Sequence, residues 1–264
     1  MIKKIVYIGI DLFYPALSEL AGLCEIGQIV TCKTDNVTEF NREICHYAEE
    51  HHIPLKIGKI TAADLDDWSS RGFDLIICGG YYHRIPVREK EKIPIVNIHP
   101  SLLPKGRGAW PMPVAILQGD TVSGITIHKM SEEFDEGDIL LQKEVPIYAD
   151  DNLETLTMRM RKQLPELMRQ LIQDFEQLWK SARVQGEGEY LKMPEEKDWT
   201  VTSAMDCREA DKILRAFWGY ECIYRNGNDK FELIYGRIRR EEAPGSITFP
   251  IKDGEIIADR VRKI

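Results

Sequence analysis

The chain has 264 residues, of which 43% are hydrophobic and 30% are charged, and its formal net charge is −8. This length favours one large domain plus a smaller one, and the hydrophobic fraction suffices for a packed core, so the composition excludes a disordered chain. The negative charge provides no general attraction to nucleic acid or to anionic membranes. It weighs against an RNA substrate without excluding one, because a local basic patch can coexist with an acidic total.

The cysteines and the N-terminus indicate a cytoplasmic protein. The six cysteines form no CxxC pair, and Cys32 and Cys78 lie inside apolar runs, which is typical of reduced core thiols. The first apolar run ends at Asp11 and is too short for a secretory signal, so we expect a β-strand there. No apolar stretch approaches the ~20 residues needed to cross a bilayer.

The first half of the chain alternates short β-rich runs with helical segments. We expect strands at residues 5–10, 29–32, 54–57, 73–78 and 95–98, and helices at 15–23 and 37–52. The strand at 5–10 is continuously apolar, as expected for a parallel strand that is buried on both faces. This alternation predicts an α/β fold with a Rossmann-like, doubly wound and mostly parallel sheet.

The pattern changes after Gly124. We expect strands at 125–130 and 139–147 around an acidic turn, then two helices divided at Pro165, the second running through Phe175 and Leu178. A Gly-, Glu- and Lys-rich stretch, 184–197, predicts a linker. A capped helix at 206–218, a hairpin around Asn226-Gly227-Asn228 and short strands at 247–249 and 255–259 then predict a small β-rich C-terminal domain. The predicted domains are 1–183, a linker at 184–200, and 201–264 as a truncated, β-barrel-like unit.

Two polar side chains mark the end of the strand at 95–98. Ligands of such sheets bind at the carboxyl ends of the parallel strands. Asn97 and His99 are two residues apart, so in an extended chain they face the same way. An amide donor beside an imidazole suits a developing oxyanion. Taken alone, a hydrogen-bonded strand end is the commoner explanation of such a pair.

The continuation of this strand resembles a family signature. NIHPSLLP at 97–104 is similar to the motif of the folate-dependent formyltransferases, which include glycinamide ribonucleotide formyltransferase, methionyl-tRNA formyltransferase and the sugar-nucleotide N-formyltransferases. GITIHKM at 124–130 with FDEGDIL at 134–140 gives a second match, and GYYHRIP at 80–86 a third. The three motifs occur in the family's order, and the resemblance runs from about residue 5 to 178.

The resemblance implies an N-formyltransferase with the formyltransferase fold, 10-formyltetrahydrofolate as co-substrate and no metal. Asn97, His99 and Asp135 are the implied catalytic residues. Asn97 would donate to the oxygen of the formyl group, and His99, held protonated by Asp135, would stabilise the oxyanion. Asp135 would accept a proton from the attacking amine.

The same motifs imply the residues that bind the two substrates. The implied folate contacts are Tyr82, His83, Arg84, Ile85, Ser101 and Asp138, and the implied acceptor contacts are Tyr81, Lys105, Arg107 and Trp110. Trp110 is equally plausible as packing, and we expect His128 to be structural rather than catalytic. The spacing of Cys45, His46, His51 and His52 matches no common zinc pattern. The lack of a GxGxxG motif after the first strand argues against a nicotinamide dinucleotide.

The acceptor is predicted from the remaining differences within the family. The C-terminal domain resembles the start of the barrel domain of methionyl-tRNA formyltransferase and of the arabinose-modifying sugar formyltransferase, which argues against a glycinamide ribonucleotide enzyme. The tRNA enzymes carry a basic insertion where residues 32–42 are not basic. We therefore expect an amino-sugar nucleotide as acceptor, with no membrane partner and no nucleic acid.

Several alternatives remain open from the sequence. Methionyl-tRNA formylation is the first, and hydrolysis of 10-formyltetrahydrofolate with water as acceptor is the second. The third is a binding module that kept the fold and lost the chemistry. An unpaired edge strand in the C-terminal domain would also be a plausible seam for a homodimer.

Overall fold

The computed structural model describes residues 2–33, 41–88, 91–240 and 247–264. The chain forms two compact units. The N-terminal unit consists of Met1–Arg107, Gly124–Val145 and Arg159–Tyr190, and the C-terminal unit of Gly108–Ser123, Pro146–Met158 and Leu191–Ile264. The units thus interleave along the sequence. The predicted division at 1–183, 184–200 and 201–264 stays a prediction.

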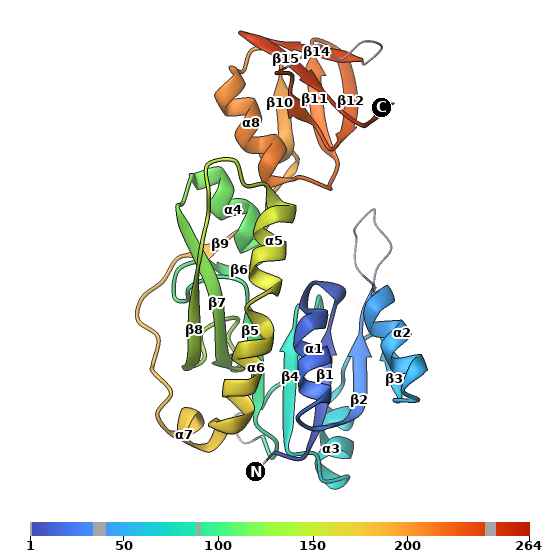
Figure 1. Ribbon diagram of the computed structural model, residues 1–264, viewed down its shortest axis with the longest axis vertical. Coiled ribbons are helices and arrows are strands. Elements are labelled where there is room, and N and C mark those ends of the chain that lie inside the picture. Colours follow the sequence, from blue (N-terminus) through green and yellow to red (C-terminus); the bar gives the residue numbers. More distant parts are fainter. Residues whose placement is uncertain (1, 34–40, 89–90, 241–246) are drawn as a thin grey trace. The chain divides into compact units, whose positions relative to one another are not determined.

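A seven-stranded sheet in the order β3-β2-β1-β4-β5-β7-β8 organises the N-terminal unit (Figure 1). Its strands are β1 (Lys4–Gly9), β2 (Glu25–Thr31), β3 (Leu55–Ile57), β4 (Leu75–Gly79), β5 (Ile95–His99), β7 (Val122–Lys129) and β8 (Ile139–Pro146). The first five pair in parallel, and β7 pairs antiparallel with β5. The prediction of a mostly parallel, doubly wound sheet is therefore confirmed.

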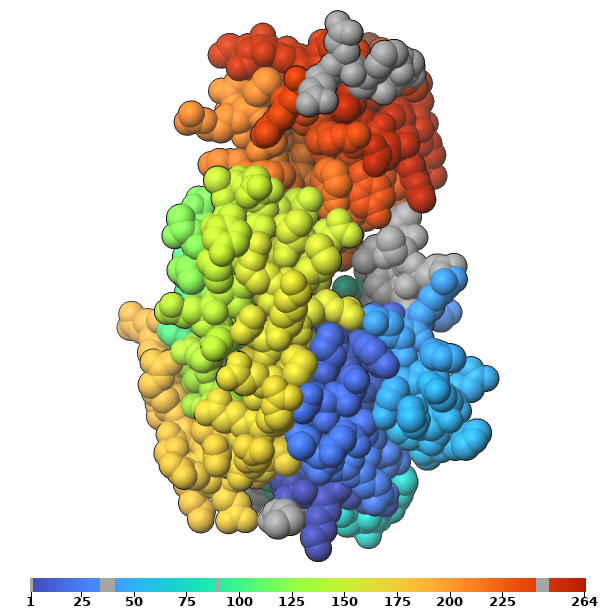
Figure 2. Space-filling view, viewed as in Figure 1, coloured from blue at the N-terminus to red at the C-terminus, as the bar shows by residue number. Residues whose placement is uncertain are grey.

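Helices flank this sheet. They are α1 (Tyr14–Ala21), α2 (Arg42–Glu50), α3 (Ala62–Ser70), α6 (Leu164–Gln173) and α7 (Phe175–Lys180), with a 3-10 turn at Asp11–Phe13. Helices α1 and α6 lie side by side, and Figure 2 shows their side chains in close contact. Leu17 of α1 and Leu171 of α6 are fully buried, while Glu19 and Arg169 form an ion pair of 2.9 Å at the surface. The apolar stripes predicted for these segments therefore pack within the unit.

The predicted helix through Phe175 and Leu178 is wrong in one respect. Helix α5 (Leu153–Arg161) does end before Pro165, as predicted, and this proline lies in the first turn of α6. However, α6 ends at Gln173, because the backbone of Asp174 is no longer helical (φ −110°, ψ 15°). Asp174 occupies the N-cap position of the separate helix α7. Aspartate favours such positions since its carboxylate competes for nearby backbone groups inside a helix.

The C-terminal unit combines helices with two small sheets. Its elements are α4 (Pro111–Gln118), α8 (Cys207–Ala216), a sheet of β10 (Thr200–Thr202), β11 (Cys222–Asn226), β12 (Asp229–Ile234) and β16 (Arg260–Lys263), and a sheet of β13 (Arg237–Ile238), β15 (Gly254–Ile257) and β14 (Thr248–Ile251). The β11–β12 hairpin turns at Gly227, whose φ of 58° suits glycine, as the sequence predicted. Residues 241–246, within the predicted C-terminal domain, lie outside the described residues.

The predicted linker also contains ordered structure. It holds β9 (Tyr190–Leu191), which pairs with β6 (Arg107–Gly108), and a 3-10 turn at Glu196–Trp199. The Gly-rich composition of this segment did not indicate the short strand β9, because β9 pairs with a strand about eighty residues earlier in the chain. Within the described ranges no helix combines the length and the hydrophobicity needed to cross a bilayer.

Helix α8 offers a test of the fold. The Asp206 carboxylate accepts a hydrogen bond from the backbone N–H of Glu209 (2.9 Å), and the Glu209 side chain accepts one from the N–H of Asp206 (3.0 Å). Asp206→Ala is expected to lower the free energy of unfolding by about 1 kcal/mol, because it removes this cap. Asp206→Asn is the control, since asparagine caps almost as well. Urea denaturation followed by circular dichroism measures both, and equal losses would contradict the capping role.

Candidate functional site

The three predicted catalytic side chains come together at the end of β5. Asn97 Nδ2 lies 3.4 Å and His99 Nδ1 lies 3.5 Å from the same oxygen, Asp135 Oδ1. The neighbouring parallel strands β1 and β4 end at Gly9 and Gly79, so the site lies at the carboxyl edge of the sheet. Asp135 comes from the loop between β7 and β8 and has a left-handed backbone, with φ at 55°. One strand and one loop thus bring these three side chains together.

The ring of His99 is held by the loop that follows β5. His99 is only 5% exposed, and its Nε2 lies 2.7 Å from the carbonyl oxygen of Gly106. A carbonyl accepts only, so Nε2 carries the proton of this bond. Ser101 donates its hydroxyl to the carbonyls of Lys105 (2.8 Å) and Gly106 (3.2 Å) and so fixes the same turn. Nδ1 of His99 is thereby left facing Asp135.

Two opposing influences act on the pKa of His99. Burial lowers this pKa below its usual value and is the largest effect, and His128 lowers it further. The carboxylate of Asp135 and the bond to Gly106 raise it. Asp135 therefore favours the charged imidazole, as expected, against the effect of burial. That Asp135 holds His99 protonated during the reaction stays a prediction.

His128 is a fourth member of the cluster. It lies directly opposite Asn97 in the antiparallel β5–β7 pair, where facing side chains share one side of the sheet. Its Nδ1 donates to the carbonyl of Lys129 (2.8 Å), so Nε2 is free to accept from Asn97 Nδ2 (3.1 Å). Nε2 also lies 3.6 Å from Asp135 Oδ1. His128, expected to be structural, therefore orients the amide of Asn97, and only the strand register reveals this.

The loop that carries Asp135 has little room to vary. A Cβ added to Gly137 would lie 1.9 Å from the carbonyl oxygen of Lys129, so only glycine fits there. Asp138, a predicted folate contact, forms an ion pair of 3.0 Å with the ammonium of Lys129. The side chain of Asp138 thus ties the loop to β7.

The predicted folate loop, residues 80–86, contacts the acidic turn of residues 131–138. Arg84 donates to the carbonyl of Glu132 (2.7 Å), and its guanidinium lies 5.7 Å from the ring centre of Phe134. Tyr82 is 43% exposed, and the ring of His83 packs edge-on against Tyr81. Ile85 is buried in a hydrophobic core cluster together with Ile76 and Cys78 of β4. The loop therefore presents one exposed aromatic ring and anchors itself with its other side chains.

The predicted acceptor contacts Tyr81, Trp110 and Lys105 differ in their surroundings. The hydroxyl of Tyr81 donates to the carbonyl of Gly58 (2.5 Å) and accepts from the N–H of Ile60 (3.0 Å), and burial raises its pKa to about 12. Trp110 packs against Tyr220 within the C-terminal unit, with ring centres 4.7 Å apart. Both side chains thus support the backbone around them, and Lys105 is exposed.

Arg107 is the most constrained of these predicted contacts. It is only 8% exposed and donates to the side chain of Gln185, to the carbonyl of Gly186 (3.0 Å) and to Glu136 (3.4 Å). Its guanidinium is therefore occupied by acceptors of the protein itself rather than exposed to a phosphate. Gln185 lies in the predicted linker and belongs to none of the motifs, so sequence reasoning missed it.

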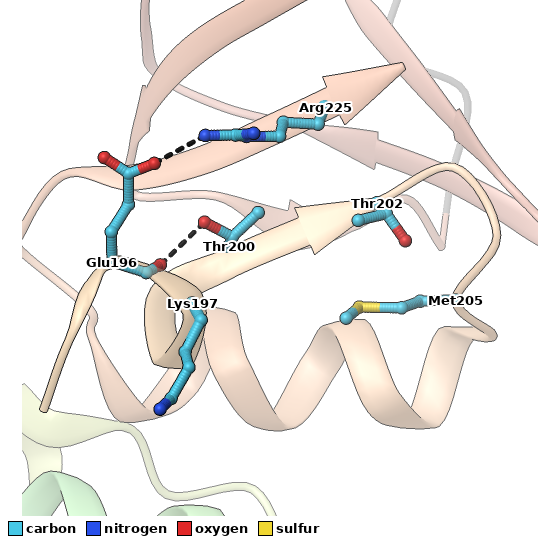
Figure 3. Close-up of a pocket in the computed structure, with 6 residues that line it drawn as sticks. All are labelled: Glu196, Lys197, Thr200, Thr202, Met205 and Arg225. Carbon is cyan, nitrogen blue, oxygen red and sulfur yellow. Dashed lines mark hydrogen bonds and ion pairs between the residues drawn. The ribbon is translucent and has the colours of Figure 1, made fainter. Parts of the chain in front are cut away.

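A separate cavity of about 310 Å³ lies in the C-terminal unit (Figure 3). Glu196, Lys197, Thr200, Thr202, Met205 and Arg225 line it, and none of these is a predicted site residue. Lys230 and Arg225 form ion pairs with Glu196 and hold the pKa of its carboxyl below the usual range. Glu196 thus offsets part of the positive charge of Arg225 and Lys230. Among the residues that the structure describes, no group of three or more His, Cys, Asp or Glu side chains is arranged to hold a metal ion.

Comparisons with known proteins point to one group. The formyl transferase family profile matches residues 58–172. Methionyl-tRNA formyltransferase from Treponema denticola is 32% identical over 219 residues, which are 79% of this chain and 68% of that protein. HypX from Aquifex aeolicus in complex with tetrahydrofolic acid has a TM-score of 0.69 at 16% identity, covering 98% of this chain and 44% of that one. The N-formyltransferase from Helicobacter canadensis in complex with folinic acid and dTDP-3-aminofucose has a TM-score of 0.68 at 19% identity, covering 100% of both chains.

Proposed function

Because this chain belongs to the folate-dependent formyltransferase family, we propose that it transfers the formyl group of 10-formyltetrahydrofolate to the primary amine of an amino-sugar nucleotide in the cytoplasm. The predicted family and enzyme class are confirmed by the relatives. The observation that carries the catalytic part is the convergence of Asn97 and His99 on one oxygen of Asp135, at distances of 3.4 and 3.5 Å. All six cysteines are free thiols, which supports a reducing compartment.

The two loops beside the cluster suit a folate. Tyr82 is 43% and Phe134 is 53% exposed, so each loop offers an aromatic face on which a flat pterin ring can stack. Arg84 joins the loops through the carbonyl of Glu132 and keeps these faces in fixed positions. When bound, 10-formyltetrahydrofolate supplies an activated formyl group. Residues 80–86 and the ring of Phe134 would hold it.

The cluster supplies a donor, a cation and a base. Asn97 donates one amide N–H to His128, which orients the group, and its other N–H, 3.4 Å from Asp135 Oδ1 in the free chain, would turn to the oxygen on which negative charge develops. His99 can donate to that oxygen only from Nδ1, because its Nε2 proton is held by the carbonyl of Gly106. Asp135 accepts the proton of the attacking amine and stabilises the charged form of His99.

The charge distribution of the C-terminal unit supports a small acceptor over a tRNA. Four of its basic side chains form ion pairs of 2.6 Å with acidic ones: Arg237 with Asp259, Arg239 with Glu255, Arg262 with Glu232, and Lys263 with Asp229. Attraction to phosphates needs clustered positive charge that is not already neutralised. The Helicobacter canadensis structure, which holds an amino-sugar nucleotide, has the same fold over its whole length.

Formylation of methionyl-tRNA is the second candidate. The relative from Treponema denticola carries that name and shares 32% identity, which is the observation that favours it. The predicted lack of a basic insertion concerns residues 32–42, of which 34–40 lie outside the described residues. The choice between the two acceptors therefore depends on a direct assay.

A mass-spectrometric assay tests the proposal. Purified protein and 10-formyltetrahydrofolate are offered a panel of dTDP-, UDP- and GDP-amino sugars, with methionyl-tRNA in parallel and a reaction without acceptor as control. We expect one sugar nucleotide to gain a formyl group while tetrahydrofolate is released in equal amount. Formylated methionyl-tRNA without a sugar product would support the second candidate. Release of tetrahydrofolate without acceptor would identify a hydrolase.

A further inference from the structure

Gln185 reaches the catalytic loop from the segment that the sequence predicts to be a linker. Its Nε2 donates to the backbone carbonyls of Asp135 (2.9 Å) and Gly137 (2.7 Å), which both belong to the turn that carries the catalytic aspartate. Its Oε1 accepts from Nε (3.2 Å) and Nη2 (3.0 Å) of Arg107. Because arginine only donates and carbonyls only accept, these partners leave one possible orientation of the Gln185 amide. All four hydrogen-bonding positions of this side chain are thus used.

The buried side chain of Arg107 holds Gln185 in place. It is 8% exposed, and it also donates to the carbonyl of Gly186 (3.0 Å), so it holds the side chain and the backbone of the same segment. It directly follows Gly106, whose carbonyl anchors His99 Nε2. One continuous set of bonds therefore runs from the anchor of His99 to the backbone of Asp135.

The loop needs such support. Asp135 has a φ of 55°, a conformation that residues with a side chain adopt only when their surroundings enforce it. Its carboxylate lies 3.4 Å from Asn97 Nδ2 and 3.5 Å from His99 Nδ1, which is long for hydrogen bonds. A small shift of the loop would therefore separate the carboxylate from both side chains. A misplacement of about 1 Å can lower a catalytic rate by roughly 10²-fold.

We infer that Gln185 is a positioning residue for formyl transfer, which holds the left-handed turn so that Asp135 faces Asn97 and His99. Its hydrogen bonds to the turn go to backbone carbonyls, so it acts through the backbone of the turn. The inference rests on the proposed function only for the catalytic measurement. Gln185, which lies in a segment that the sequence predicts to be a linker, therefore supports the catalytic loop.

Three variants test this inference. Gln185→Ala removes both donors and the acceptor, whereas Gln185→Glu keeps the size and the acceptor for Arg107 but turns a carboxylate toward two carbonyls. Glu187→Ala, an exposed position in the same segment, is the control. We expect kcat to fall by about 10- to 100-fold in both Gln185 variants, with KM for the acceptor changed less than about twofold. Glu187→Ala should match the wild-type chain. Should Gln185→Ala not fold, Gln185→Glu decides.

A second readout needs neither folate nor acceptor. Asp135 raises the pKa of His99, so a loop that moves away should lower that pKa further in Gln185→Ala. Titration of the His99 ring protons by NMR measures this, with His99→Gln used for assignment. A kcat within twofold of wild type together with an unchanged titration would overturn the inference, as would an equal loss in Glu187→Ala. If the wild-type chain transferred formyl to no acceptor offered, the proposed function would fail, and the titration alone would decide the role of Gln185.

Discussion

Asp135→Asn is expected to lower kcat for formyl transfer by about 10³-fold and to leave the fold intact. An amide cannot accept the proton of the attacking amine, and positioned proton transfer contributes about 10²- to 10⁴-fold to a rate. The Asp135 carboxylate lies 3.5 Å from His99 Nδ1, and its negative charge favours the charged imidazole. The change to asparagine removes this charge. The Asp135 side chain is 13% exposed and asparagine has nearly its shape, so the loop should keep its conformation.

Glu133→Gln is the matched control for this prediction. It makes the same change of charge in the same loop, but at an exposed side chain two residues before Asp135. Single-turnover kinetics, with the reaction quenched and the tetrahydrofolate formed then quantified, separate the chemical step from product release. A loss of less than tenfold in Asp135→Asn would rule out Asp135 as the proton acceptor. An equal loss in Glu133→Gln would mean that the charge of the loop, and not the position of this carboxylate, matters.

The core of the site was predictable because short motifs encode it. Asn97 and His99 lie two residues apart on one strand, so their common direction follows from the strand period alone. Asp135 was identified through the resemblance of FDEGDIL to a known signature. The sheet was predictable for a related reason: its inner strands, such as β1 with Ile5 to Ile8 fully buried, are continuous apolar runs.

Residues whose role depends on distant contacts were not predictable. His128 adjoins Asn97 because β7 runs antiparallel to β5 with one particular register, and a sequence does not state that register. Gln185 reaches Asp135 across fifty residues of chain. Tyr81 and Trp110 looked like acceptor contacts because they are aromatic and near the motifs, yet the structure uses them for packing and for backbone hydrogen bonds.

His99→Gln is the second variant with a large expected effect. Glutamine can still donate to the carbonyl of Gly106, but it cannot take up a proton and donate from the Nδ1 side. Loss of one donor to a developing oxyanion typically costs about 10²- to 10³-fold in rate, and we expect kcat to fall by that factor. His46→Gln is the control, because His46 is an exposed histidine of α2 beside Glu50. A loss of less than about tenfold would contradict the role of His99.

The pH dependence gives a sharper test of the same residue. Burial lowers the pKa of His99 below its usual value of about 6.5, so the free chain gains the required second proton only as the pH falls. The ratio of wild-type to His99→Gln kcat/KM should therefore rise as the pH is lowered, since titration of the acceptor amine affects both proteins alike. The unfolded chain binds this proton at higher pH than the folded one, so wild-type stability should decline below about pH 6.5 more steeply than that of the variant. A ratio that stays constant between about pH 5 and pH 8 would mean that His99 acts in its neutral form.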